Sequence, residues 1–317
     1  MIKAGILGTD TLIETYIDLL MQLNSFQLVG LYDINDEKAL DIHKKFDIPI
    51  FTHPDELFDE ADALITTSGF NTYQCLKTAL RKSKHIFIEK PAEYSISQTR
   101  ELINLSDEAG VVVQMGFRHR YNPSFLAARP FISPQVRMIQ TRRLLPYKEN
   151  CALHPVQDIM LHDVDNILSV VNSSIRKISA YGISTTDQKP DAVNALIEFH
   201  NGCIANLTAN TIAGMETQNA VFFNPKDYIE IDFLNHKATR YSKRAENNMT
   251  LFGENKNDLN CEYIPVKNAN EMADELEAFS RSILKMRNPE VNLENTSRTM
   301  AVIREINSRL KLTVNCL

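Results

Sequence analysis

Short apolar runs alternate with amphipathic stretches up to Gly116. Apolar runs typical of buried strands lie at residues 2–7, 27–32, 48–51, 62–67, 85–89 and 111–115. Helical spacing of apolar positions is found between them, at 11–23, 36–46, 71–83 and 95–109. The last of these begins with Ser95 and Gln98 in capping-box spacing. This alternation predicts an α/β domain built on a doubly wound parallel sheet.

The pattern changes after Gly116, where longer strands follow one another without helices between them. They are expected at 135–143, 176–184, 192–199, 202–211, 219–223, 228–233 and 237–242. Asn201-Gly202 joins two of them and is a strong hairpin signal. Helices are expected at 155–171, 270–287 and 296–311. The sequence therefore predicts a second, α+β domain with a large, mostly antiparallel sheet.

Composition narrows the class of protein. The chain has 317 residues, which favours two domains, with 44% hydrophobic and 23% charged residues. No apolar run approaches the ~20 residues that span a bilayer, and Met1–Gly5 enters a strand without a signal-peptide pattern, so we expect a cytoplasmic protein without a membrane partner. Five scattered cysteines predict neither disulfides nor a zinc site, and a net charge of −6 argues against nucleic-acid binding.

The first loop resembles a dinucleotide fingerprint that has lost two of its three glycines. It reads Gly8-Thr9-Asp10-Thr11-Leu12-Ile13, so Asp10 and Ile13 replace glycines that normally admit a pyrophosphate and allow close packing. Asp10 is also expected to be the N-cap of the following helix. Its charge would then repel a phosphate by about 1–4 kcal/mol at ~4 Å, depending on the dielectric.

Asp33 follows the second strand, at the position where an acid accepts hydrogen bonds from an adenosine ribose. No arginine follows in Ile34-Asn35-Asp36 to bind a 2′-phosphate, which predicts NAD rather than NADP. The alternative is that Asp33 is only a turn or cap residue.

Two further segments carry candidate chemistry. Glu89-Lys90-Pro91 ends the fifth strand, and proline stops that strand, so we expect Lys90 at the sheet rim where ligands bind. In the helix predicted over 155–171, Asp158 and His162 are one turn apart, an arrangement suited to a general base. A solvated ion pair, or a metal site formed with His154, are the alternatives.

Basic residues gather between Phe117 and Lys148, where no Asp or Glu occurs. The seven are Arg118, Arg120, Arg129, Arg137, Arg142, Arg143 and Lys148. Guanidinium groups suit phosphates and carboxylates, so an anionic substrate is expected, although a basic outer strand face or a subunit contact is equally compatible.

Together, Glu89-Lys90-Pro91, the segment Gly116–Pro123 and the Asp158/His162 pair resemble the glucose–fructose oxidoreductase / inositol dehydrogenase (Gfo/Idh/MocA) family. Segments 158–165 and 201–209 resemble its nucleotide-sugar 3-dehydrogenase branch, of the type that oxidises UDP-N-acetylglucosamine. The resemblance implies a Rossmann domain at 1–117, a substrate and oligomerisation domain at 118–295, and a C-terminal helix at 296–317 that packs back on the first domain. It also implies a homodimer or homotetramer formed through the second sheet.

By this resemblance Lys90 is the catalytic lysine, His162 accepts a proton from a sugar hydroxyl, and Asp158 is the partner of His162. The implied cofactor residues are Gly8, Thr9, Asp10, Thr11, Leu12, Asp33, Thr67, Ser68, Glu89 and Lys90. The implied substrate residues are Lys90, Arg118, Arg120, Tyr121, Arg142, Arg143, Asp158 and His162, with no metal. The sequence departs from the family where Ser68 and Thr72 replace a proline and a histidine beside the nicotinamide.

Three functions remain open from the sequence. The first is NAD-dependent oxidation of a secondary hydroxyl of a sugar or nucleotide sugar. The second, favoured by Asp10, is a family member that binds its cofactor poorly and acts as a sugar-nucleotide binding or regulatory protein. The third is a lyase or hydrolase that uses a tightly held NAD transiently.

Overall fold

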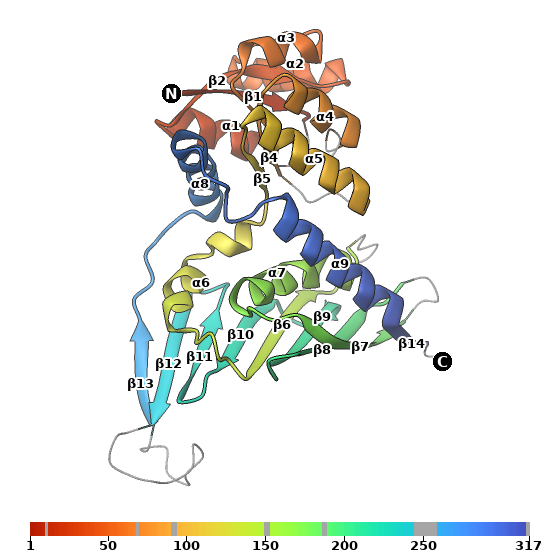
Figure 1. Ribbon diagram of the computed structural model, residues 1–317, viewed down its shortest axis with the longest axis vertical. Helices are drawn as coiled ribbons and strands as arrows, with labels where there is room; N and C mark the ends of the chain where they lie inside the picture. Colours follow the sequence, from red (N-terminus) through yellow and green to blue (C-terminus); the bar gives the residue numbers. More distant parts are fainter. Residues whose placement is uncertain are drawn as a thin grey trace. The chain divides into compact units, whose positions relative to one another are not determined.

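The computed structural model describes residues 1–9, 12–67, 70, 72–89, 94–148, 153–185, 189–243 and 259–314. Its contacts divide the chain into two compact units (Figure 1). The first comprises Met1–Arg118 and Glu271–Arg298, and the second His119–Asn270 and Thr299–Leu317. Within the described ranges, no helix is long and apolar enough to cross a membrane.

The first unit contains a five-stranded parallel sheet with the order β2-β1-β3-β4-β5. The strands are β1 (Ile2–Leu7), β2 (Phe26–Tyr32), β3 (Ala63–Thr66), β4 (His85–Ile88) and β5 (Val113–Met115). The helices between them are α1 (Ile13–Gln22), α2 (Asp36–Phe46), α3 (Pro54–Glu60), α4 (Tyr73–Arg81) and α5 (Ile96–Ala109). The predicted doubly wound parallel sheet is confirmed, and its order places the topological switch point between β1 and β3.

Helix α8 (Glu271–Lys285) completes the core of this unit, although it lies far away in sequence. Its Phe279 ring lies 6.4 Å from the ring of Phe26 and 5.8 Å from that of Phe87, and Leu276 beside it is fully buried. Burying such side chains contributes about 1.5–3 kcal/mol each, which explains why α8 groups with the first unit.

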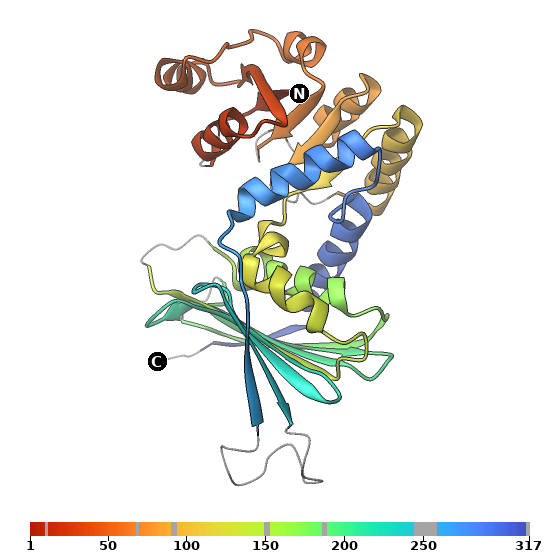
Figure 2. The ribbon, with the colours of Figure 1, turned by 90° about the vertical axis from the view of Figure 1, so that its left-hand side faces the viewer.

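The second unit is a nine-stranded sheet with helices on one face (Figure 2). Its order is β13-β12-β11-β10-β6-β9-β8-β7-β14, and all neighbours are antiparallel except β6–β9 and β7–β14. The strands are β6 (Met138–Pro146), β7 (Ile175–Ser184), β8 (Ala192–Phe199), β9 (Ile204–Ala213), β10 (Thr217–Phe223), β11 (Asp227–Asp232), β12 (Lys237–Lys243), β13 (Leu259–Ile264) and β14 (Leu310–Val314). The predicted mostly antiparallel sheet is confirmed.

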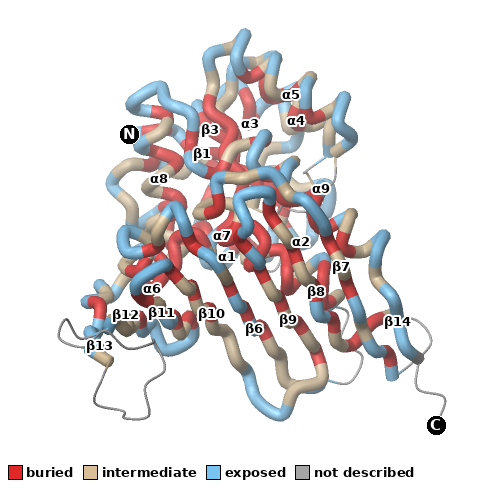
Figure 3. The backbone as a smooth tube through the Cα atoms, turned by 60° about the horizontal axis from the view of Figure 1, so that its bottom comes forward, coloured by how far each residue is buried: buried red, intermediate tan, exposed pale blue. Residues whose placement is uncertain are grey.

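The covering elements are η2 (Arg118–Tyr121), α6 (Pro123–Ala128), η3 (Arg129–Phe131), the π-helical turn η4 (Pro155–Met160), α7 (Leu161–Val170) and α9 (Leu293–Arg309). Burial alternates along the strands, as β8 shows with Val193, Ala195 and Ile197 buried and Asn194 exposed (Figure 3). One face therefore packs on the helices, and the other carries no helix among the residues that the structure describes.

Two predictions that depend only on neighbouring residues are confirmed. Ser95 and Gln98 form the predicted capping box, and Gly202 adopts a φ of 86° in the hairpin between β8 and β9. Other expectations were wrong. Residues 48–51 make only an isolated bridge from Ile50 to Leu31, and residues 155–160 are π-helical rather than α-helical.

The unit boundaries differ from the expected division at the C-terminal end. Helix α8 belongs to the first unit, whereas Thr299–Leu317 belongs to the second, because α9 contributes Thr299 to the buried side chains of that unit and β14 extends its sheet beside β7. The segment 296–317 is therefore not a single helix.

Candidate active site

The first loop of the parallel sheet requires a glycine at its start. Gly8 has a φ of 98°, and a Cβ there would overlap the hydroxyl oxygen of Thr67 at the end of β3. The Thr67 hydroxyl donates to the carbonyl of Leu7 at 3.2 Å, and the Gly8 amide donates to the carbonyl of Tyr32 at 2.9 Å. The ends of β1, β2 and β3 are thus drawn together, and only glycine fits between them.

Asp33 lies at the carboxyl end of β2 and is tied to this loop. Its Oδ2 accepts a hydrogen bond from the Thr9 hydroxyl at 2.6 Å, and its Oδ1 accepts from the Asn35 amide at 2.8 Å. The carboxylate is half-buried. It therefore acts as a turn residue through one oxygen and reaches the glycine loop through the other. Because a carboxylate oxygen has two lone pairs, this geometry also fits acceptance from a ribose hydroxyl.

The start of α1 differs from its expected form. Leu12, and not Asp10, is at the N-cap position, and it makes no side-chain cap hydrogen bond. Ile13 is 3% exposed and belongs to the core cluster, so a buried side chain fills the place of the third fingerprint glycine. The predicted repulsion of a phosphate assumed that Asp10 is the N-cap of α1, and the structure has Leu12 at that position instead. Asp10 and Thr11 lie outside the described residues.

Other predicted cofactor residues follow β3 and β4. Thr67 is buried, and Glu89 is half-buried directly after β4. Thr72 is the N-cap of α4, where its side chain accepts from the Cys75 amide at 3.2 Å. Ser68 and Lys90 lie outside the described residues, and the placement of Lys90 stays a prediction.

In the second unit, His154 and Asp158 cap the π-helical turn reciprocally. The Nδ1 atom of His154 accepts from the amides of Val156 and Gln157 at 3.2 and 3.3 Å. The Asp158 Oδ2 atom accepts from the His154 amide at 2.8 Å. Burial, opposed by Asp158 and aided by Lys189, lowers the pKa of His154, which favours the neutral ring that can accept these bonds.

His162 follows this turn as the second residue of α7 and is half-buried. Its ring lies 4.2 Å from the ring of His119, centre to centre, at an interplanar angle of 65°. Asp158 and His162 therefore lie on either side of a π-to-α junction, a kind of irregularity that is frequent at functional sites. His119 was not among the predicted site residues, although it stands in the Gly116–Pro123 segment that carried the family resemblance.

Two of the basic residues predicted to bind substrate are buried in ion pairs. Arg120 donates through Nε and Nη2 to Asp165 at 2.5 and 3.1 Å. Arg143 donates to Asp163 through Nε and Nη2 at 3.2 and 2.9 Å, and to Gln218 through Nη1 at 2.6 Å.

Burial also raises the pKa of Asp165, and Arg120 opposes that rise. Both guanidinium groups already donate to buried carboxylates of the second unit, which argues against Arg120 and Arg143 as substrate ligands. Tyr121 is likewise buried, whereas Arg118 and Arg142 are exposed.

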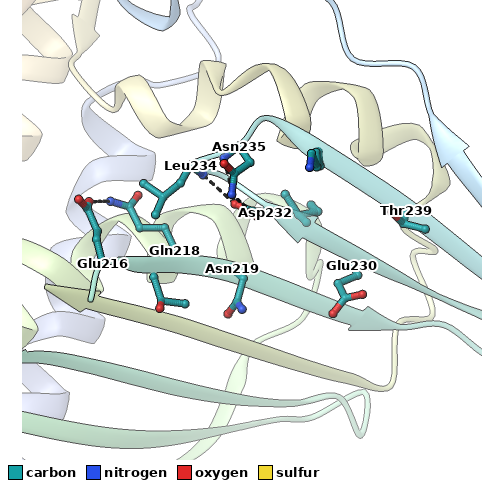
Figure 4. A pocket seen from close by; sticks show the side chains of 11 residues that line it. Glu216, Gln218, Asn219, Glu230, Asp232, Leu234, Asn235 and Thr239 are labelled. Carbon is teal, nitrogen blue, oxygen red and sulfur yellow. Dashed lines mark hydrogen bonds between the residues drawn. The ribbon is translucent and has the colours of Figure 1, made fainter. Parts of the chain in front are cut away.

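A pocket of about 350 Å³ lies elsewhere, on strands β10 to β12 (Figure 4). Its lining residues are Glu216, Thr217, Gln218, Asn219, Glu230, Ile231, Asp232, Leu234, Asn235, Lys237 and Thr239. The Asp232 carboxylate accepts hydrogen bonds from Leu234 and Asn235, so it stabilises the turn after β11. Predicted site residues do not line this pocket. Across the described part of the chain, no group of three or more His, Cys, Asp or Glu could hold a metal ion.

The glycine loop, the acid after β2 and the parallel sheet define the first unit as the Rossmann domain of a dinucleotide-dependent enzyme. Residues 2–117 match the family model described as the oxidoreductase family with an NAD-binding Rossmann fold. This match agrees with the resemblance to the Gfo/Idh/MocA family that the sequence motifs carry.

Known relatives agree with this assignment. Over 223 residues the chain is 27% identical to a UDP-N-acetylglucosamine 3-dehydrogenase from Acidithiobacillus ferrooxidans, covering 69% of this chain and 71% of the relative. Over 122 residues it is 33% identical to a glucose-6-phosphate 3-dehydrogenase from Bacillus subtilis, covering 38% of this chain and 35% of the relative.

Solved structures share the fold over the whole chain. The structure of the Acidithiobacillus ferrooxidans enzyme has a TM-score of 0.89 at 22% identity and covers 98% of this chain and 97% of its own. A 3-ketoreductase from Actinomadura kijaniata in complex with NADP has a TM-score of 0.77 at 16% identity, with 99% of each chain covered.

Proposed function

We propose that this protein is an NAD-dependent dehydrogenase that oxidises a secondary hydroxyl of an anionic sugar. The observation that carries the proposal is the hydrogen bond from the Thr9 hydroxyl to the Asp33 carboxylate. Both residues lie in the segment that matches an NAD-binding oxidoreductase family. Relatives named for 3-dehydrogenation of UDP-N-acetylglucosamine and of glucose 6-phosphate support a sugar substrate that carries phosphate.

Nicotinamide supplies the hydride acceptor when it is bound. We propose that the Gly8 loop, with Thr9 and Leu12, and Asp33 hold the cofactor, with Thr67 and Glu89 contributing at the ends of β3 and β4. Gly8 leaves space where a Cβ would collide, and Asp33 offers its carboxylate to the ribose. The absence of an arginine in Ile34-Asn35-Asp36 supports NAD over NADP. Because the Actinomadura enzyme was crystallised with NADP, the affinities of this protein for NAD and for NADP are to be compared directly.

For the proton, we propose His162 as the group that accepts it from the sugar hydroxyl, Asp158 as the residue that orients His162, and Lys90 as the catalytic lysine. The half-buried His162 ring beside His119 supports this role, because a base needs a restrained orientation. Arg118 and Arg142 are the exposed arginines that we retain for the substrate phosphate.

We also propose a cytoplasmic homo-oligomer, a dimer or tetramer formed through the helix-free face of the nine-stranded sheet. That face carries a ladder of stacked rings, with Phe223 5.7 Å from Tyr228 and Tyr228 4.6 Å from Tyr241. Sedimentation of the purified protein measures the assembly directly, and a monomer at all concentrations would contradict it.

The function is tested by isothermal titration of the purified protein with NAD and with NADP, followed by spectrophotometric detection of NADH with UDP-N-acetylglucosamine, glucose 6-phosphate and myo-inositol. We expect NAD binding, and turnover with a phosphorylated sugar that exceeds turnover with inositol. A protein that binds the nucleotide sugar but neither dinucleotide would instead support a binding or regulatory role, for which Ile13 at a fingerprint glycine position is the supporting observation.

A further inference from the structure

A buried ion pair joins the two segments that carry the facing imidazole rings. His119 belongs to η2, and His162 belongs to α7. The residue after His119 is Arg120, whose Nε and Nη2 atoms donate to Asp165 at 2.5 and 3.1 Å. Asp165 follows His162 by three residues, so their side chains are neighbours on the surface of α7. The ion pair therefore links η2 to α7 within one helical turn of the ring contact.

The geometry of this ion pair fixes an orientation as well as a distance. The side chains of Arg120 and Asp165 are 7% and 1% exposed, so water screens them little. Each carboxylate oxygen accepts from a different guanidinium nitrogen, and the Thr299 hydroxyl of α9 donates to Oδ1 at 3.3 Å. Two hydrogen bonds between two planar groups set the angle between them. A rotation of η2 against α7 would break at least one of these bonds in a buried place.

Each of the two segments is also held on the nine-stranded sheet. In η2, the His119 carbonyl accepts from the Asn122 amide at 3.4 Å, and the Asn122 side chain donates to the Phe233 carbonyl at 3.3 Å. In α7, the Asp163 carboxylate accepts from Arg143 of β6 at 2.9 Å. The sheet thus supports η2 and α7 separately, and the ion pair described above connects them directly.

We infer that Arg120 is a positioning residue, which acts through Asp165 to hold the His119 ring against the His162 ring and so fixes the orientation of His162. The consequence for catalysis rests on the proposed function, because His162 is the proposed base, whereas the ring geometry does not depend on it. A base has to reach its proton within about 2.6–3.2 Å. Desolvation offsets much of the attraction within a buried ion pair, so a role in geometry accounts for this pair better than a role in stability.

The ring contact is tested without substrate, by NMR of protein labelled with ¹³C in its histidine rings. We expect a nuclear Overhauser cross-peak between the two rings in the wild type, assigned by its absence from His162→Gln. Arg120→Lys keeps the positive charge but lacks the planar fork, so the cross-peak should weaken several-fold. The matched control is Arg240→Lys, which makes the same change at the buried carboxylate of Asp227 and should keep the full cross-peak.

A second pair of variants removes a single hydroxyl group. Thr299→Val deletes the bond to Asp165 and keeps the shape of the side chain, so the cross-peak should weaken in the same direction. Thr296→Val on the same helix is its control, because that buried hydroxyl has no hydrogen-bond partner in the described part of the chain. A full cross-peak in folded Arg120→Lys would overturn the inference. If Arg120→Lys does not fold, a full cross-peak in Thr299→Val would overturn it instead.

The second test applies to the active enzyme. Arg120→Lys should lower kcat by about tenfold to 10²-fold, the usual effect of a misplaced catalytic group, and leave the KM for NAD unchanged. Arg240→Lys should keep the kcat of the wild type, even where it lowers the unfolding temperature as much. Equal losses of kcat in the two variants, or a normal kcat in a variant that has lost the ring contact, would overturn the positioning role. A wild-type protein with the ring contact but no dehydrogenase activity would refute the proposed function alone.

Discussion

The rings of His119 and His162 lie 4.2 Å apart at 65° to one another, so each restricts the orientation of the other. Two protonated rings at such a distance would repel by about 1 kcal/mol in water and by about 4 kcal/mol at an intermediate dielectric. The contact with His119 restrains the His162 ring, and a restrained orientation is what a general base needs.

We predict that His162→Gln lowers kcat by about 10²–10⁴-fold, the usual cost of losing a general base, and leaves the unfolding temperature nearly unchanged. His119→Phe should retain the edge-to-face contact and with it the orientation of the His162 ring, so its turnover should stay near that of the wild type. Steady-state kinetics against pH measures both. His200→Gln, at an exposed turn, is the control, and wild-type turnover in His162→Gln would refute its role.

Asp33→Asn tests the cofactor residue. Losing a charged hydrogen-bond acceptor typically costs about 1.5–3 kcal/mol, so NAD affinity should fall about tenfold or more. The preference for NAD over NADP should narrow, because the carboxylate no longer repels a 2′-phosphate. Calorimetric titration with both cofactors decides the matter. Asp36→Asn, exposed in the first turn of α2, should change neither affinity. An unchanged NAD affinity in Asp33→Asn would leave Asp33 as a turn residue.

Arg142 and Arg143 are adjacent in β6, but substitution by methionine should affect protein stability at Arg143 and substrate affinity at Arg142. Arg143→Met leaves the buried Asp163 uncompensated, which typically costs about 3–5 kcal/mol of unfolding free energy. Arg142→Met removes an exposed charge, so stability should change by less than about 0.5 kcal/mol while affinity for a phosphorylated sugar falls. Urea unfolding and substrate titration at two salt concentrations separate the effects. Equal stability losses would contradict this division of roles.

His154 predicts a pH dependence of stability. Its pKa is lowered from 6.5 in the folded protein, so the unfolded chain binds a proton more readily. The contribution of this residue is complete above about pH 6.5 and is lost as the pH falls below that value towards the lowered pKa of the folded state.

His154→Asn keeps an N-cap side chain, worth about 0.5–2 kcal/mol, without titrating there. The difference in melting temperature between wild type and His154→Asn should therefore move in favour of the variant on acidification. A difference that is constant between about pH 5 and about pH 8 would exclude the proposed cap protonation.

The elements that sequence predicted best are those whose signals are local. The capping box of Ser95 and Gln98 and the turn at Gly202 need only nearby atoms. Helix α3 also has a local signal, Pro54 at its first position followed by two acids, but it was not among the predicted helices. Strand β14 overlaps the predicted helix 296–311, because its pairing with distant β7 overrides the helical preference of its residues.

The candidate site shows the same limit. Gly8 and Asp33 lie together at one edge of the parallel sheet, as their positions directly after two neighbouring strands predict, whereas their roles toward a cofactor stay a prediction. Arg120 and Arg143 were expected at the substrate, since nothing in a basic run reveals carboxylate partners 45 and 20 positions away. The spacing of Asp158 and His162 assumed 3.6 residues per turn, whereas the backbone adopts a π-helical turn that side-chain periodicity does not encode.

Helix α8 has a consequence for the order in which the protein forms during its synthesis. The first unit reaches Arg118, and 152 residues (119 to 270) must be translated before α8 supplies Leu276 and Phe279 to the core around Phe26 and Phe87. At ribosomal rates that delay is on the order of ten seconds or more. The nascent Rossmann domain emerges with an unfilled apolar face, so an isolated 1–118 fragment should need α8 added in trans, or a chaperone, to stay unaggregated.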